Sequence, residues 1–206
     1  KTTKYKRREA RSLHRTQSRN YIKNSLWELS RHVTADNIKV KDLASYSGVS
    51  RTVFYRNFGC LSDVWHSIGH DVLNDIASSQ ELFYTDSGQG LRENVLQNVA
   101  ACIYHSKDKI QNITSEYGDP IFIPKFEKQT QIWIQQCISK SQHWEENLQQ
   151  KQMASFLSQA VVHAALDGIK ENNFEKLSQS FLSLDQIFYA LHVKDNIVSF
   201  YDKEHS

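Results

Sequence analysis

The sequence contains little glycine, proline or cysteine. Only 7 Gly and 2 Pro occur in 206 residues, and a β-rich fold of this length needs many tight turns, so this scarcity favours long helices. The three cysteines, Cys60, Cys102 and Cys137, are widely separated and form no Cys-x-x-Cys pair. This spacing argues against a disulfide framework and predicts isolated thiols in a reducing compartment.

A long apolar run is also missing. No stretch approaches the ~20 residues that a helix needs to span a bilayer, and Lys1 to Arg19 is charged where a signal peptide would be apolar. Hydrophobic residues make up 39% and charged residues 23% of the chain, as is typical of soluble globular proteins. We therefore expect a cytoplasmic protein with a full hydrophobic core and no membrane partner.

The net charge of +2 conceals a strong asymmetry along the chain. Residues 1–58 hold 14 Lys and Arg against four Asp and Glu, a balance of +10. Residues 59–206 hold 11 basic and 19 acidic residues, a balance of −8. Such a split predicts a polyanion-binding first quarter on a body that does not touch the polyanion. A merely solvated basic tail is the alternative.

Apolar residues recur at helical spacing along most of the chain. Residues 1–16 are basic and lack this periodicity, so we interpret them as a flexible arm. No segment predicts a strand, and the fold class is all-α with about nine helices. The expected helices are 17–35, 40–47, 50–57, 61–78, 91–105, 106–117, 125–142, 146–171 and 174–193.

The stretch from Ile38 to Asp63 predicts a helix-turn-helix. Two short helices joined by a tight turn with glycine can place the second helix in a DNA major groove. Ala44 is small enough for a crossing helix to come close, and Gly48 can adopt the left-handed conformation that ends the first helix. Ser50 can cap the second helix by accepting a bond from a backbone N–H group of its first turn.

The second helix of this motif has two chemically different faces. Phe54 and Phe58 are four residues apart and share one face, which we expect to be buried. Two arginines, a threonine and a tyrosine are left to face outward, where they are suited to base edges and phosphates. These outward residues are Arg51, Thr52, Tyr55 and Arg56.

The pattern Leu43-Ala44-x-x-x-Gly48-Val49-Ser50-x-x-x-Phe54-Tyr55-x-x-Phe58 resembles the signature of the TetR family of bacterial transcription regulators. The resemblance covers about residues 17–75. It implies a helix-turn-helix DNA-binding domain at 17–62 and a helical effector-binding and dimerisation domain at 63–206. The implied function is that of a homodimeric repressor, which binds double-stranded operator DNA and is released by a small-molecule effector.

Three alternatives remain open on the sequence alone. An activator and a regulator controlled by a partner protein both belong to the same family. A helical protein–protein adaptor, whose helix-turn-helix no longer binds DNA, belongs to another class. An enzyme is not expected, because the sequence contains no nucleophile elbow, phosphate loop or metal-ligand set, and no cofactor is implied.

The predicted DNA contacts lie on and around the two short helices. They are Lys39, Lys41, Ser50, Arg51, Thr52, Val53, Tyr55, Arg56 and Asn57. The chain departs from the family pattern at five positions. Lys39 stands where a Thr or Ser usually caps, Cys60 replaces a Ser cap, and Leu61 replaces a phosphate-binding Lys. Val53 stands where Thr, Ser or Ala is common, and Asn57 where His or Tyr is common. These departures shift the expected phosphate contacts to Lys39, Lys41 and the basic arm.

Two further sites are predicted in the second part of the chain, each with ordinary core packing as the alternative. A narrow apolar seam and a run of small residues predict a dimer interface. Its residues are Ala160, Ala164, Leu177, Phe181, Leu184, Phe188 and Leu191. A mixture of aromatic and polar residues predicts a ligand pocket. Its residues are Tyr104, Asn112, Tyr117, Phe122, Phe126 and Trp133.

His66 and His70 are four residues apart on one helix face, a spacing that can bind a transition metal. Two histidines are too few for a closed site, and no Cys or acid at ligand spacing completes the set. We expect exposed histidines and no metal.

Overall fold

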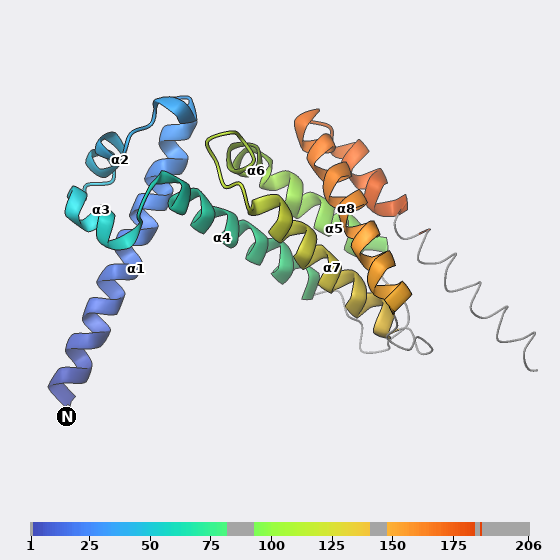
Figure 1. The fold of residues 1–206 in the computed structure, drawn as a ribbon, viewed down its shortest axis with the longest axis horizontal. Coiled ribbons are helices and arrows are strands. Elements are labelled where there is room, and N and C mark those ends of the chain that lie inside the picture. Colours follow the sequence, from blue (N-terminus) through green and yellow to red (C-terminus); the bar gives the residue numbers. More distant parts are fainter. Residues whose placement is uncertain (1, 82–92, 141–147, 184–185, 187–206) are drawn as a thin grey trace, which may run out of the picture. The chain divides into compact units, whose positions relative to one another are not determined.

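The computed structural model describes residues 2–81, 93–140, 148–183 and 186, and every regular element in these ranges is a helix. The all-α prediction is confirmed (Figure 1). Residues 174–183 are also helical, whereas the rest of the predicted helix to residue 193 lies largely outside the described residues. The elements are α1 (Thr2–Ser30), η1 (Ala35–Asn37), α2 (Val40–Tyr46), α3 (Arg51–Asn57), α4 (Leu61–Glu81), α5 (Glu93–His105), α6 (Lys107–Ile113), α7 (Phe122–Lys140) and α8 (Leu148–Lys170).

Two helices begin earlier than their apolar patterns predict. α1 begins at Thr2, so the prediction of a flexible arm is wrong for residues 2–16. Six of the fifteen residues in this stretch are Lys or Arg, which favour helix, and no Gly or Pro occurs before Gly48. α7 begins at Phe122 instead of Lys125. Pro124 falls in the first turn of α7, where a missing N–H group breaks no helical hydrogen bond.

The chain divides into two compact units, which we call the head and the body. The head comprises Lys1–Val72 and Asp108–Phe122, and the body comprises Leu73–Lys107 and Ile123–Ser206. This division differs from the predicted boundary after residue 62, because it falls inside α4 and groups most of α6 and the following turn with the first helices.

The head has a core of apolar side chains from its first four helices. Ile22 and Leu26 of α1 are fully buried, as their spacing predicts, and α1 packs against both α2 and α3. Leu43 of α2 and Phe54 of α3 are fully buried as well, and Trp65 from α4 is 2% exposed. This core fixes the two short helices of the predicted motif on the longer helices around them.

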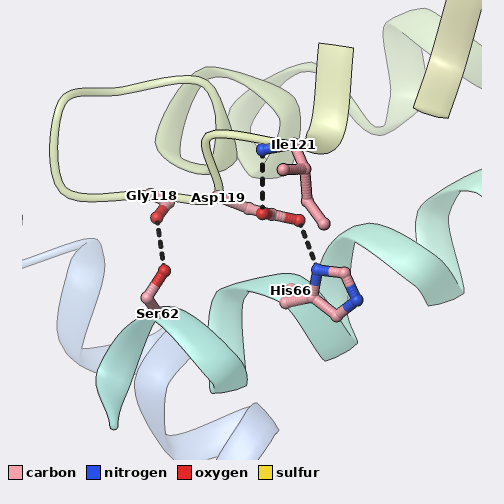
Figure 2. A network of polar contacts seen from close by, with 5 residues as sticks. All are labelled: Ser62, His66, Gly118, Asp119 and Ile121. Carbon is pink, nitrogen blue, oxygen red and sulfur yellow. Dashed lines mark hydrogen bonds and ion pairs between the residues drawn. The ribbon is translucent and has the colours of Figure 1, made fainter. Parts of the chain in front are cut away.

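A turn after α6 is bound to α4 within the head (Figure 2). The Ser62 hydroxyl donates to the Gly118 carbonyl at 3.1 Å. Asp119 is buried; its Oδ1 accepts from the Ile121 N–H at 3.1 Å and its Oδ2 lies 2.9 Å from His66 Nδ1. Because it ties two segments far apart in sequence, this network makes the turn part of the head.

The prediction of two exposed histidines is therefore only half correct. The His66 side chain is 38% exposed and faces the Asp119 carboxylate, whereas His70 is exposed as expected. Within the described residues, no group of three or more His, Cys, Asp and Glu could hold a metal ion.

Among the same described residues, no helix has both the length and the apolar character that a membrane crossing needs.

The body is built on α8, which contacts α5. Gly168 of α8 lies directly against Leu177, since a Cβ on this glycine would lie 2.8 Å from the Leu177 Cβ. Leu177 and Phe181 are 0% and 2% exposed within the chain itself. The prediction that Leu177 and Phe181 lie in a dimer interface is thus wrong, because residues of their own chain already cover both side chains.

The other residues of the predicted interface have different positions. Ala160 is exposed and Ala164 is half-buried on α8. Leu184, Phe188 and Leu191 lie outside the described residues.

The residues of the predicted ligand pocket divide between the two units. Tyr104, Phe126 and Trp133 belong to the body, where the last two are buried. Asn112, Tyr117 and Phe122 belong to the head. In the head, the Asn112 amide donates to the Ser30 hydroxyl at 3.4 Å, Tyr117 is 53% exposed and Phe122 is buried. The structure does not gather these six residues within one unit.

Candidate nucleic-acid interface

The turn between α2 and α3 has the backbone that its sequence predicts. Gly48 adopts φ +66°, the left-handed conformation that costs least at glycine. The Val49 N–H donates to the Ala44 carbonyl at 3.0 Å, which closes the end of α2. Ser50 then has an extended backbone and its hydroxyl accepts from the Val53 N–H at 3.2 Å, so it caps α3. The glycine and the cap set the direction in which α3 leaves the turn.

α3 is divided into a buried and an exposed face. Phe54 and Phe58 are 0% and 4% exposed, and their ring centroids lie 6.2 Å apart. Tyr55 is 57% exposed and stands edge-on to the Phe54 ring at 5.4 Å, so aromatic packing orients it. The predicted outward residues Arg51, Thr52, Tyr55 and Arg56 are all exposed, and Val53 is half-buried.

Asn57 does not belong to this exposed face, and its predicted role as a DNA contact is wrong. It is only 7% exposed, and its amide Nδ2 donates to the Val53 carbonyl at 2.8 Å. Its position three residues after Phe54 and one before Phe58 places it toward the buried side of α3. Its polarity serves to satisfy a carbonyl at the end of the helix.

Lys39 and Lys41 are both exposed at the beginning of α2. Lys39 occupies the N-cap position and its side chain makes no capping hydrogen bond, as predicted from its departure from the family pattern. The head therefore presents two ammonium groups on α2 in addition to the two guanidinium groups on α3.

Arg19 of α1 holds the end of α3, a role that the sequence analysis missed. Its guanidinium lies 4.2 Å from the centroid of the Phe58 ring, a cation–π contact. Its Nη1 donates to the Asn57 carbonyl at 2.6 Å, and its Nη2 reaches the Ser67 hydroxyl of α4 at 3.5 Å. The only hint in the sequence is its position three residues before Ile22, on the face of α1 that enters the core.

A surface hollow of about 600 Å³ adjoins the exposed face of α3. Asp63 occupies part of its wall, where its carboxylate accepts from the N–H groups of Gly59 at 2.8 Å and Cys60 at 3.3 Å. Asp63, the third residue of α4, thus supplies the reciprocal half of a capping box, because its carboxylate bonds back to the N–H of the residue that precedes the helix. The hollow is lined by Arg19, Tyr55, Arg56, Asn57, Phe58, Gly59, Asp63, His66, Ser67 and His70.

The exposed groups of α2 and α3 can bind a nucleic acid in two ways. A guanidinium can make paired hydrogen bonds to the O6 and N7 atoms of guanine in the major groove. Ammonium and hydroxyl groups can bind phosphates, which position a protein without reading sequence. The site has both kinds of group on a rigid support.

No family model and no curated protein matches the sequence. Solved structures do match the fold. The dihydroxyacetone kinase operon activator DhaS has a TM-score of 0.62 and 18% identity, over 84% of this chain and 97% of that one. A TetR-family transcriptional regulator from Streptomyces coelicolor has a TM-score of 0.60 and 16% identity, over 92% and 85%.

A third similar structure is FadR from Thermus thermophilus, a TetR-family transcriptional repressor in complex with lauroyl-CoA. Its TM-score is 0.56 and its identity 16%, over 80% of this chain and 90% of that one. Likeness at such low identity is likeness of fold. The chain has the fold of the TetR-family transcriptional regulators.

Proposed function

We propose that the protein is a sequence-specific DNA-binding transcription regulator that reads the major groove of an operator with α3. The observation that carries the proposal is the row of exposed side chains on α3, opposite the buried Phe54 and Phe58. Arg51 and Arg56 supply guanidinium groups for base edges, and the Tyr55 hydroxyl is placed for a phosphate. A helical adaptor without DNA binding would have no use for this exposed, positively charged surface.

The distribution of charge supports one orientation on DNA. Residues 1–58 carry a balance of +10 and residues 59–206 one of −8. The phosphate backbone attracts the first part of the chain and repels the second. This asymmetry favours complexes in which α2 and α3 meet the duplex.

The regulator acts as a homodimer through the exposed face of α8. Phe156 on α8 is 72% exposed, the highest value among the exposed large hydrophobic side chains described. Ala160 follows one turn later and is also exposed, and a small residue there allows a second helix to approach closely. A two-fold dimer places two copies of α3 on half-sites one helical turn or a multiple of it apart.

A small-molecule effector in the body releases this repressor from DNA. The indole N–H of Trp133 is buried, and among the described residues no group accepts its hydrogen bond. An orphaned donor among apolar neighbours fits a largely apolar ligand with one hydrogen-bond acceptor. The similar FadR structure contains lauroyl-CoA, so a protein of this fold can bind an acyl ligand.

We propose that the protein represses transcription and that it does so in a bacterial cytoplasm. Among the similar structures FadR is a repressor and DhaS is an activator, so proteins of this fold include both repressors and activators. α4 belongs to the body at its end and to the head at its beginning, where Ser62 and His66 bind the turn at Gly118 and Asp119 (Figure 2). A ligand that displaced the end of α4 would therefore also displace the head.

The experiment that tests the proposed function is selection of duplexes from a random library by the full-length protein. A shift assay at stated salt then compares the wild type with Arg51→Ala/Arg56→Ala on the enriched duplex. Arg31→Ala is the control, because Arg31 is an exposed arginine of the head that faces Glu28 at 3.7 Å. We expect one sequence to be enriched and only the α3 variant to lose it. Failure to enrich any sequence contradicts the proposal.

A further inference from the structure

The hollow beside α3 lies wholly within the head. Its walls come from three helices: Arg19 of α1, the end of α3 from Tyr55 onward, and α4 from Asp63 to His70. A volume of about 600 Å³ is in the range of sites that bind small chemical groups. The head therefore has a concave surface next to the face that is proposed to read DNA.

The fixed charges on the walls of this hollow favour an anion. Arg19 and Arg56 contribute two guanidinium groups, which are always protonated. Among the lining residues only Asp63 has a carboxylate. Its Oδ2 already accepts from the N–H groups of Gly59 at 2.8 Å and Cys60 at 3.3 Å. Two positive groups thus stand against one negative group that backbone donors already bind.

The two histidines of the lining do not oppose this charge, because an imidazole is either neutral or positive. His70 is exposed. The His66 Nδ1 atom lies 2.9 Å from Oδ2 of the buried Asp119, which does not line the hollow. The Asp119 carboxylate is therefore engaged by His66 and by the Ile121 N–H group.

Arg19 is held in a fixed orientation at the wall. Its guanidinium lies 4.2 Å from the centroid of the Phe58 ring. Its Nη1 donates to the Asn57 carbonyl at 2.6 Å and its Nη2 to the Ser67 hydroxyl at 3.5 Å. These bonds use two of its five N–H groups. A guanidinium oriented in advance loses little entropy when its remaining N–H groups bind an oxygen anion.

The hollow is also placed beside the path of a DNA strand. Tyr55 and Arg56 line it and at the same time belong to the exposed face of α3. A helix that enters the major groove, which is about 12 Å wide, lies between two rows of phosphates. A duplex bound by α3 therefore brings one of these rows next to the hollow.

We infer that the hollow is a binding site for one phosphodiester group of the operator, with Arg19 as its main ligand. The inference rests on the proposed function and deepens it. Arg19 thereby has two roles, because the guanidinium that holds the end of α3 also binds the strand beside it. A free phosphate ester carries the same anionic group, and the position next to α3 favours the group on DNA.

A carboxylate at position 67 tests this phosphate site without releasing Arg19. Ser67→Asp places the carboxylate where the hydroxyl now meets Arg19 Nη2, so it pairs with the guanidinium and occupies donors that would bind a phosphate. Ser67→Asn is the control of similar shape without the charge. Asn24→Asp is the control for charge, since Asn24 is exposed on α1 about 140° around the helix from Arg19.

The phosphate that enters the hollow is located with methylphosphonates, each of which replaces one charged phosphodiester by a neutral group. The full-length proteins are titrated with the duplex that the wild type enriches from a random library, and the methylphosphonate is moved one position at a time. At one position in each half-site, it should weaken binding about tenfold for the wild type and both controls. At that position it should leave the affinity of Ser67→Asp unchanged.

The dependence of binding on salt gives a second measurement on the same proteins. For Ser67→Asp, the slope of log affinity against log salt should fall by ~0.9 per protomer, as expected for the loss of one phosphate contact. Ser67→Asn and Asn24→Asp should keep the wild-type slope. Thermal unfolding verifies that each variant is folded. His70→Asp repeats the test from an exposed position of the same wall, in case Ser67→Asp does not fold.

Two results would overturn the phosphate site. One is a methylphosphonate scan of Ser67→Asp and His70→Asp that equals the wild-type scan at every position. The other is an effect on free phosphate alone: inorganic phosphate, compared with chloride at equal ionic strength, stabilises the wild type and not Ser67→Asp, while the scans agree. Both results leave the proposed function intact, whereas a wild type that enriches no sequence contradicts the proposed function and the phosphate site together.

Discussion

Replacement of Arg19 by Met removes the guanidinium that ties α1 to the end of α3. Met keeps the apolar stem of the side chain, so the change acts mainly on the polar contacts. The cation–π contact with Phe58 at 4.2 Å is worth about 0.5–2 kcal/mol. The hydrogen bond to the Asn57 carbonyl at 2.6 Å, from a charged donor, adds about 1.5–3 kcal/mol. The 3.5 Å contact with Ser67 adds little.

We expect Arg19→Met to lower the free energy of unfolding by about 2–3 kcal/mol, below the simple sum because Arg19 is partly solvated. Denaturant unfolding measures this change. Arg19→Lys should lose less stability than Arg19→Met, because its ammonium keeps a positive charge and hydrogen-bond donors but lacks the planar guanidinium that lies over the Phe58 ring.

The matched control is Arg15→Met, one turn earlier on the same face. Arg15 is exposed, so its removal should leave the unfolding free energy within about 0.5 kcal/mol of the wild type. An Arg19→Met variant that is as stable as Arg15→Met would refute the role of Arg19 in holding α3.

Three further changes test other parts of the structure. Phe156→Asp should give folded monomers in sedimentation, since the Phe156 side chain is 72% exposed on the proposed interface. Phe181→Asp should instead destabilise the body, since Phe181 is 2% exposed and an unpaired charge there would be buried. Dimers that persist with Phe156→Asp would place the interface elsewhere. Asp119→Asn keeps an acceptor for the Ile121 N–H but removes the charge that faces His66. The free energy of unfolding should fall by about 1–3 kcal/mol, which thermal unfolding measures. An unchanged midpoint would contradict the importance of this network. Tyr55→Phe should weaken binding to every duplex by a similar factor in titrations, because a phosphate contact carries no base information; a loss confined to one sequence would make Tyr55 a base reader.

Local rules explain why much of the head could be predicted from sequence. The left-handed backbone at Gly48, the cap at Ser50 and the buried pair Phe54 and Phe58 each depend on residues within a few positions. Such interactions are determined by neighbours in the chain and are visible as spacing.

The missed features have three physical causes. The helix at residues 2–16 contains few apolar residues and so shows no apolar period, and periodicity could not reveal it. Arg19 and His66 bind partners 38 and 53 positions away, and the sequence does not show which distant groups will meet. Phe181 illustrates the third cause, since an apolar seam suits the chain's own core as well as a second copy.

The most direct test of sequence-specific binding by α3 is a titration of wild type and Arg56→Ala against the enriched duplex and all its single-base variants. Arg56→Ala should cost about 1–3 kcal/mol on the enriched sequence and lose discrimination at one base pair in each half-site, related by two-fold symmetry. Arg31→Ala should change neither. If the wild type binds the enriched duplex no more tightly than its variants, α3 does not read sequence and the account is contradicted.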